Sequence, residues 1–150
     1  MPISTVEIDC EPEQTFAFVT DPTRFAEWQN GVVTAHMETS GTPAVGDKCL
    51  MTRRVGFAQR VTTSAVTHVD PPRTWGVRGI DGPVRATVNV TVEGLDGGKR
   101  SRVAIDVEFK GNGIGKLLVP LVVGPQAAKE MPANLKRLKQ RLEEPGASRR

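Results

Sequence analysis

The sequence predicts an α+β domain in which an antiparallel sheet of seven strands packs against one long C-terminal helix. Two observations predict this fold class. Residues 84–95 and 102–110 alternate between apolar and polar side chains, which is typical of strands whose sheet is buried on one face only. Residues 113–144 carry apolar side chains at alternating steps of four and three, which places them on one face of a helix.

The expected elements follow the chain in the order strand, two short helices, six strands and long helix. The first strand covers residues 3–10. Pro12 and the pair Asp21-Pro22 suit the starts of the two short helices, because proline fits the first helical turn and aspartate caps it. The second short helix ends at Gly31. The other strands are expected at residues 32–39, 47–55, 59–69, 73–80, 84–95 and 102–110.

Turn residues separate the predicted strands. Gly56 marks a tight turn, and residues 96–98, Asp-Gly-Gly, are a hairpin signal. Val66 and Val69 are three residues apart, which breaks the alternation of their strand. The spacing therefore predicts a β-bulge next to His68.

Three prolines interrupt the long helix, at Pro120, Pro125 and Pro132. Each removes a backbone donor and clashes with the preceding turn, so we expect a kinked or two-part helix. The main part would begin at Pro125, after a loop and a short helix. The middle of the apolar face is small, with Gly124 and Ala128. Small residues there either leave room for a cavity or allow another element to approach closely.

The composition is typical of a single domain, expected at residues 1–144, followed by a disordered tail at residues 145–150. We find no secretory signal and no apolar stretch long enough to span a membrane. Cys10 and Cys49 have neither a metal-site spacing nor a disulfide framework. We therefore expect a cytoplasmic protein without metal or cofactor, whose contact with membranes is at most transient. The sequence does not indicate an oligomeric state.

The charge is unevenly distributed. The chain has a net charge of +3, but from Lys110 onward nine Lys or Arg stand against three Glu. Such a basic helix is usually a solvated face, and its alternative role is contact with a partner through residues such as Lys136, Arg137 and Lys139. Because no aromatic residues interleave with the basic ones, we expect no nucleic-acid binding.

Three local motifs accompany this order of elements: residues 16–28 (FAFVTDPTRFAEW), residues 45–47 (VGD) and residues 69–73 (VDPPR). Together they resemble the START-like superfamily, also called SRPBCC or helix-grip, which includes the polyketide cyclase/dehydrase and lipid-transport families. The resemblance implies a curved sheet that grips the long helix, with an elongated apolar cavity between them. These motifs are specific for the fold and poor indicators of function.

The candidate ligand-binding residues combine strand alternation with this resemblance. They are Trp28, Met51, Arg53, Phe57, Trp75, Val77, Val88, Val90, Ile105, Val107, Leu117 and Leu121. For most of the apolar ones, plain core packing is the alternative interpretation. Phe57 lies at a hairpin tip and would either fold over the mouth of the cavity or be an ordinary exposed side chain.

Arg53 is the polar candidate, because it shares a strand face with Cys49 and Met51. If that face points inward, Arg53 would anchor an anionic group or take part in catalysis, and it would need a partner. The alternative is a strand-end arginine that reaches solvent. His36 and His68 are expected to be solvent-facing or structural, and no carboxylate or thiol accompanies them at metal-ligand spacing.

Three functions remain open at this point. The first is binding of an apolar small molecule, such as a lipid, a quinone or an aromatic polyketide. The second is a polyketide cyclase or dehydratase, although the chain has no tyrosine, on which cyclases of the superfamily often rely, and no other catalytic motif. The third is a protein-interaction module that uses the basic helix and the mouth loops.

Overall fold

The computed structural model describes residues 3–55 and 57–144. The predicted turn at Gly56 and the predicted tail at residues 145–150 lie outside the described residues. The elements are β1 (Ile3–Ile8), α1 (Pro12–Val19), the 3₁₀ helix η1 (Pro22–Glu27), β2 (Val32–Met37), β3 (Lys48–Val55), β4 (Ala58–Asp70), β5 (Thr74–Gly79), β6 (Val84–Leu95), the 3₁₀ turn η2 (Asp96–Gly98), β7 (Arg100–Gly111), α2 (Gly115–Leu118), the π-helical segment η3 (Val119–Val123) and α3 (Gly124–Glu143).

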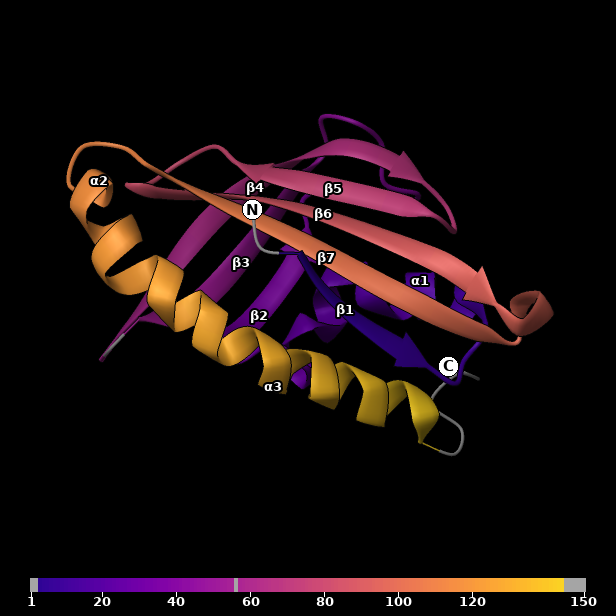
Figure 1. Cartoon of the computed structure of the whole chain (residues 1–150). Helices are drawn as coiled ribbons and strands as arrows, with labels where there is room; N and C mark the ends of the chain where they lie inside the picture. Colours follow the sequence, from indigo (N-terminus) through magenta and orange to yellow (C-terminus); the bar gives the residue numbers. More distant parts are fainter. Residues whose placement is uncertain (1–2, 56, 145–150) are drawn as a thin grey trace.

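The strands form one seven-stranded sheet in the order β1-β7-β6-β5-β4-β3-β2, and every neighbouring pair is antiparallel. The long C-terminal helix crosses one side of the curved sheet (Figure 1). This arrangement confirms the predicted helix-grip fold. The boundaries differ slightly, since β1 ends at Ile8 and β7 begins at Arg100.

Two bulges adjust which side chains point toward the helix. The register of β4 against β5 shifts between Val66 and His68, as predicted. The register of β2 against β3 also shifts, between Val32 and Thr34. This second bulge leaves Val32 and Ala35, three residues apart, both buried, whereas a regular strand would bury every second residue.

The two short helices begin as their sequences predict. Pro12 stands in the first turn of α1, where its missing N–H has no intrahelical acceptor. Asp21 caps η1, and its carboxylate accepts hydrogen bonds from the Thr23 N–H at 3.0 Å and the Thr23 hydroxyl at 2.7 Å. Both helices place buried aromatic residues, among them Phe16 and Phe25, in the core.

The long helix is divided by a change of helical type and not by a loop. Helix α2, the π-helical η3 and α3 follow one another directly from Gly115 to Glu143. Pro120 lies in the first turn of η3 and Pro125 in the first turn of α3. The wider π turn accommodates both prolines without a break in the helix. The expected loop shortens to residues 112–114. Pro132 lies inside α3.

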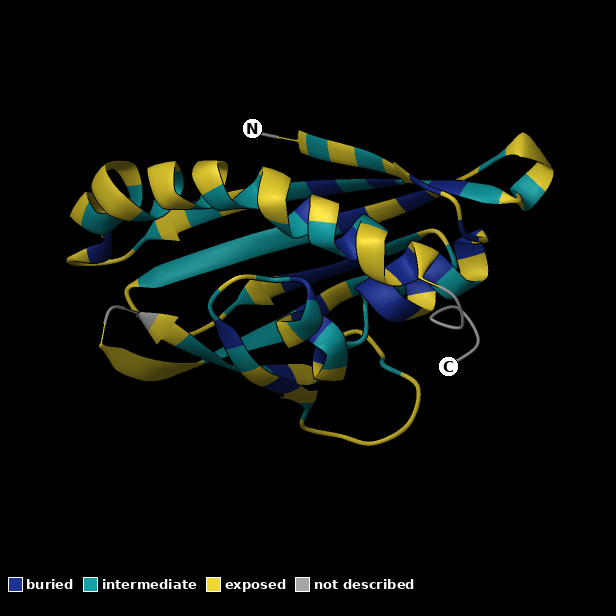
Figure 2. Cartoon of the chain, turned by 90° about the horizontal axis from the view of Figure 1, so that it is seen from below, coloured by how far each residue is buried: buried dark blue, intermediate teal, exposed yellow. Residues whose placement is uncertain are grey.

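The apolar face of this helix is covered by the rest of the protein only in its C-terminal half. Leu135, Leu138 and Leu142 are buried in the core, and α3 contacts β1, α1 and η1. In α2 and η3, Leu118, Val119 and Val123 are half-buried, whereas Leu117 is 64% exposed and Leu121 is 72% exposed, so the π turn shifts which residues meet the sheet, and the predicted face is wrong at Leu117 and Leu121. Figure 2 shows the same change along the helix, from mostly exposed at the α2 end to buried on one face near its C-terminal end.

Polar contacts join α3 to the loop between η1 and β2. The Asn30 N–H donates to the side-chain oxygen of Asn134 at 3.0 Å. The side-chain amide of Asn30 also donates to the carboxylate of Glu130, one helical turn earlier. These bonds hold the loop against the middle of α3.

The turn from β7 into α2 packs against the β5–β6 loop through backbone atoms. The Asn112 N–H donates to the Pro83 carbonyl at 2.8 Å. A Cβ atom at Gly115 would overlap the Pro83 carbonyl, and one at Gly111 would overlap the backbone of Gly115. Glycine is therefore the residue that this close approach of two backbones requires.

Within residues 3–55 and 57–144, no helix has the length and apolar character needed to cross a membrane.

The burial of residues along the helix predicts very different losses of stability for substitutions at two of its leucines. Leu138→Ala should lower the free energy of unfolding by about 2–5 kcal/mol, because it removes a fully buried side chain and leaves a cavity. Leu121→Ala, the control, should change it by less than about 0.5 kcal/mol. Urea denaturation measures both values. Similar losses in the two variants would contradict this difference in burial.

The contact between Asn134 and the η1–β2 loop predicts a local effect on amide exchange. Asn134→Ala removes the acceptor of the Asn30 N–H, so this amide should exchange faster with solvent, at a stability cost of about 1 kcal/mol or less. Gln140→Ala, at an exposed position of the same helix, should leave the Asn30 amide unchanged. Hydrogen exchange followed by NMR compares the two variants. An unaltered Asn30 amide in Asn134→Ala would show that the bond does not hold the loop.

Candidate functional site

The side of the sheet that faces α3, called the inner face below, is apolar on β6 and β7. Its burial falls from one end of these strands to the other. Val90 and Ile105 are buried, whereas Val88 and Val107 are half-buried. The half-buried end is the one that α2 contacts, and Leu118 and Val119 of the helix are half-buried there as well. The apolar surface of the sheet and the helix is therefore only partly covered at this end.

The structure brings most of the predicted site residues to the inner face or the adjoining core. Trp28, Trp75, Val77, Val90 and Ile105 are buried in the core cluster, and Met51, Val88 and Val107 pack partly buried against it. The other apolar candidates are at the surface. Phe57 is fully exposed at the β3–β4 hairpin tip and does not fold over other residues, and Leu117 and Leu121 are mostly exposed.

On β3 and β4 the inner face is polar and basic. Cys49 is buried and Met51 packs against the core, so their face of β3 is the inner one, and Arg53 shares it. The side chains opposite them on β4 follow from the strand register, which pairs Cys49 with Ser64, Met51 with Thr62 and Arg53 with Arg60. The inner face thus has an apolar part and a hydroxyl- and arginine-bearing part.

Arg53 is half-buried and poorly supplied with acceptors. Its Nη1 donates to the Asn30 carbonyl at 3.4 Å, and its Nη2 donates to the Met51 sulfur at 3.5 Å. Both bonds are weak, one by its length and the other by its acceptor. Burial lowers the pKa of Arg53, and the negative charge of Glu130 partly offsets this effect. An arginine stays protonated in proteins, so this guanidinium has donors available for an oxyanion.

The sequence reasoning missed three residues near Arg53: Asn30, which contacts it, Glu130, whose charge affects its pKa, and Asn134, which is bonded to Asn30. Asn30 contacts Arg53 through its carbonyl and contacts both α3 residues through its amide groups. Glu130 and Asn134 are four residues apart and adjoin Met131 and Leu135 of the apolar face. A polar pair at this spacing, flanking an apolar helix face, was the available signal.

Trp28 adds a second unused donor. Its side chain is 4% exposed, and in the part of the chain that the structure describes its Nε1 has no hydrogen-bond partner. The ring packs edge-on against Phe25, which packs in the same way against Trp75. An unpaired buried N–H costs free energy, so an acceptor atom of a ligand would be stabilising at this position.

The remaining titratable candidates lack the features of nucleophiles or metal ligands. Burial raises the pKa of Cys49 to about 11 and also raises the pKa of Cys10, which keeps both thiols neutral and unreactive. His36 is exposed, and His68 packs over Gly76 on the side of the sheet away from α3. Among the described residues, no group of three or more His, Cys, Asp or Glu is placed to hold a metal ion.

Some of the basic side chains of α3 form hydrogen bonds or ion pairs with other residues of the chain. Lys139 donates to the Glu7 carbonyl at 2.8 Å and pairs with Glu143 at 2.7 Å. Arg141 approaches Glu27 at 4.0 Å. These contacts attach α3 to β1 and η1, so they are structural.

Comparison with solved structures supports the fold described above. The Zhui aromatase/cyclase from Streptomyces sp. R1128 is similar with a TM-score of 0.71 and 15% sequence identity, over 97% of this chain and 96% of that chain. A START superfamily protein from Mycobacterium smegmatis is similar with a TM-score of 0.70 and 17% identity, over 95% and 97% of the two chains. At these identities the similarity establishes the fold alone. No sequence among the curated proteins matches this chain significantly.

The sequence itself matches a family model. The model described as "Polyketide cyclase / dehydrase and lipid transport" matches residues 4–143. This range includes every described helix and, apart from the first residue of β1, every described strand. The match thus covers both the sheet and the helix that it grips. The chain belongs to the polyketide cyclase/dehydrase and lipid transport family, and it has the helix-grip fold.

Proposed function

We propose that the protein binds a small amphipathic molecule on the inner face, with an apolar body near α2 and an anionic or enolic oxygen at Arg53. The observation that carries this proposal is the state of Arg53. Its guanidinium is half-buried, its pKa is lowered by burial, and its two acceptors are weak. A ligand oxygen would form charge-assisted hydrogen bonds there.

The apolar body of the ligand would cover the accessible part of the inner face. Val88 and Val107 of the sheet and Leu118 and Val119 of the helix supply apolar surface that the chain itself leaves partly uncovered. Burial of such surface is worth roughly 25 cal/mol per Å² removed from water. Lipids with an acidic headgroup, quinones and aromatic polyketides combine this apolar body with a polar oxygen.

The polar contacts are partly organised before the ligand arrives. Asn30 links Arg53 to Glu130, and the loop that carries Asn30 is bonded to Asn134. Because these bonds limit the freedom of the loop, less conformational entropy is lost on binding. The two unpaired, buried cysteines favour a reducing compartment, and we place the protein in the cytoplasm, where it would meet membranes only transiently.

The first test is native mass spectrometry of the protein purified gently from its own host, followed by extraction of any bound compound. We expect a stoichiometric amphipathic molecule. If the protein is empty, titration with an environment-sensitive apolar dye, competed by fatty acids, tests the same surface. A protein that retains no compound and binds no dye would contradict the proposal.

The role of Arg53 predicts a selective loss of affinity. Arg53→Gln should weaken binding of a fluorescent fatty acid about 10-fold or more, because a hydrogen bond to a charged group is worth about 1.5–3 kcal/mol. Binding of the methyl ester of the same fatty acid should change little. Arg54→Gln is the matched control, since Arg54 is the exposed neighbour with the same charge. Equal losses for acid and ester, or for the two variants, would contradict an anion contact at Arg53.

A second candidate is a cyclase or dehydratase that acts on a polyketide-like substrate. It is supported by the fold shared with the Zhui aromatase/cyclase and by Glu130, a carboxylate close enough to Arg53 to affect its pKa. In such a reaction Glu130 would accept a proton from carbon next to a carbonyl, while Arg53 would stabilise the resulting enolate oxygen. With a poly-β-ketone substrate, Glu130→Gln and Arg53→Gln should each lower kcat. Product formation at wild-type rates in both variants would exclude these roles.

A further inference from the structure

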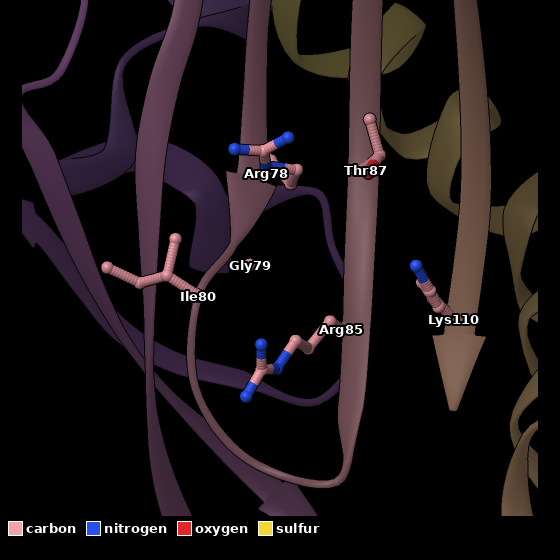
Figure 3. Close-up of a pocket in the computed structure, with 6 residues that line it drawn as sticks. All are labelled: Arg78, Gly79, Ile80, Arg85, Thr87 and Lys110. Carbon is pink, nitrogen blue, oxygen red and sulfur yellow. The ribbon is translucent and has the colours of Figure 1, made fainter. Parts of the chain in front are cut away.

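A hollow lies on the side of the sheet away from α3, called the outer face below. It has a volume of about 270 Å³ and is lined by Arg78, Gly79, Ile80, Arg85, Thr87 and Lys110. Figure 3 shows these residues where β5 and β6 separate toward their connecting loop, with Lys110 on the neighbouring β7. Pockets for drug-sized ligands begin near 300 Å³, so this hollow suits a small chemical group.

The charges of the hollow are unbalanced, in contrast to the other end of the same face. There, Arg102 pairs with Glu93 at 2.7 Å and with Glu7 at 3.0 Å, and Arg100 pairs with Glu7 at 3.6 Å and Asp96 at 3.5 Å. At the hollow, the three cations form no ion pair with any described residue.

The acidic residues nearby in the fold do not supply the missing counter-charge. Glu108, on the outer face of β7, lies directly opposite Thr87 of the hollow, but it does not line the hollow and forms no ion pair with Arg78, Arg85 or Lys110 of the described chain. Asp81, in the β5–β6 loop, accepts a hydrogen bond from the Thr63 N–H at 3.0 Å. The hollow is therefore a local concentration of positive charge.

Two of these cations face each other directly. The register of β6 against β7 pairs Arg85 with Lys110. Like charges at directly opposite positions of an antiparallel pair destabilise a sheet. The Arg85 Nε donates only to the Gly82 carbonyl, at 3.2 Å, which leaves its terminal nitrogens free among the described residues. An anion between the two side chains would remove this repulsion.

We propose that this hollow binds a phosphate group, supplied by a soluble phosphate compound or by the headgroup of an anionic lipid. Three positive charges and the Thr87 hydroxyl surround a space of suitable size, and Arg side chains match the oxygen geometry of phosphate. A phosphate with about two negative charges balances the site better than a single carboxylate does. This site is separate from the inner face, so it does not depend on the function proposed above.

The test is a titration of the whole protein with inorganic phosphate at constant ionic strength, followed by NMR of the backbone amides and the arginine Nε–H groups. Constant ionic strength is needed because salt screens exposed charges. We expect saturable shifts centred on Arg78, Arg85, Thr87 and Lys110. Arg85→Gln should weaken binding about 10-fold, and the double variant with Lys110→Gln should abolish it.

The control is Lys99→Gln, which removes the same charge at the far end of the β6–β7 hairpin and should leave phosphate binding unchanged. Because Arg85→Gln also removes a like-charge contact, it should remain folded, and its NMR spectrum verifies this. Equal weakening by Lys99→Gln would show that only net charge matters and would overturn the proposal.

A second arm identifies the source of the phosphate. Vesicles of phosphatidylcholine with and without phosphatidic acid are sedimented with the wild-type protein and with Arg85→Gln. Binding that needs both phosphatidic acid and Arg85 would assign the hollow to a lipid headgroup, even if inorganic phosphate binds weakly. Binding of inorganic phosphate alone would assign it to a soluble compound. Failure of both arms would overturn the proposal.

Discussion

The packing of Leu135, Leu138 and Leu142 into the core is the interaction on which the rest of the structure depends. These three side chains hold α3 against β1 and α1, and they fix where the helix lies along the sheet. In α2 and η3 every side chain is exposed or half-buried, so the side chains of the helix pack most tightly through its C-terminal half. The inner face is thus solid core at one end and partly covered apolar surface at the other, and the second part is where the proposed ligand would bind.

Local sequence pattern was sufficient for the elements because the forces that form them are local. Alternation on residues 84–95 identifies both the strand and its inner face, since successive side chains of a strand point to opposite sides. The bulge at His68 was visible for the same reason. The bulge at Val32 and the π-helical turn could not be predicted in this way. They depend on the pairing with the neighbouring strand and on the path of the helix over the sheet, which are not local properties of the sequence.

Only part of the candidate site could be predicted from the sequence. The face shared by Cys49, Met51 and Arg53 follows from alternation, so the position of Arg53 on the inner face was accessible. Its contacts were not, because Asn30 and Glu130 are 100 residues apart along the chain. Helical periodicity assumes a regular α-helix, so it placed Leu121 on the apolar face, whereas the π-helical turn leaves Leu121 exposed and Leu118, Val119 and Val123 half-buried. The pairing of Arg85 with Lys110 depends on strand register.

The close contact between Gly115 and the Pro83 carbonyl has a consequence for divergence within the family. Any side chain at position 115 requires the β5–β6 loop to be rebuilt at the same time, because no Cβ fits there. The atoms of residue 83 that would be overlapped are backbone atoms, so a different side chain at position 83 would not relieve the contact. Relatives with any residue other than glycine at position 115 are therefore expected to differ in the path of the β5–β6 loop, whatever residue they have at position 83.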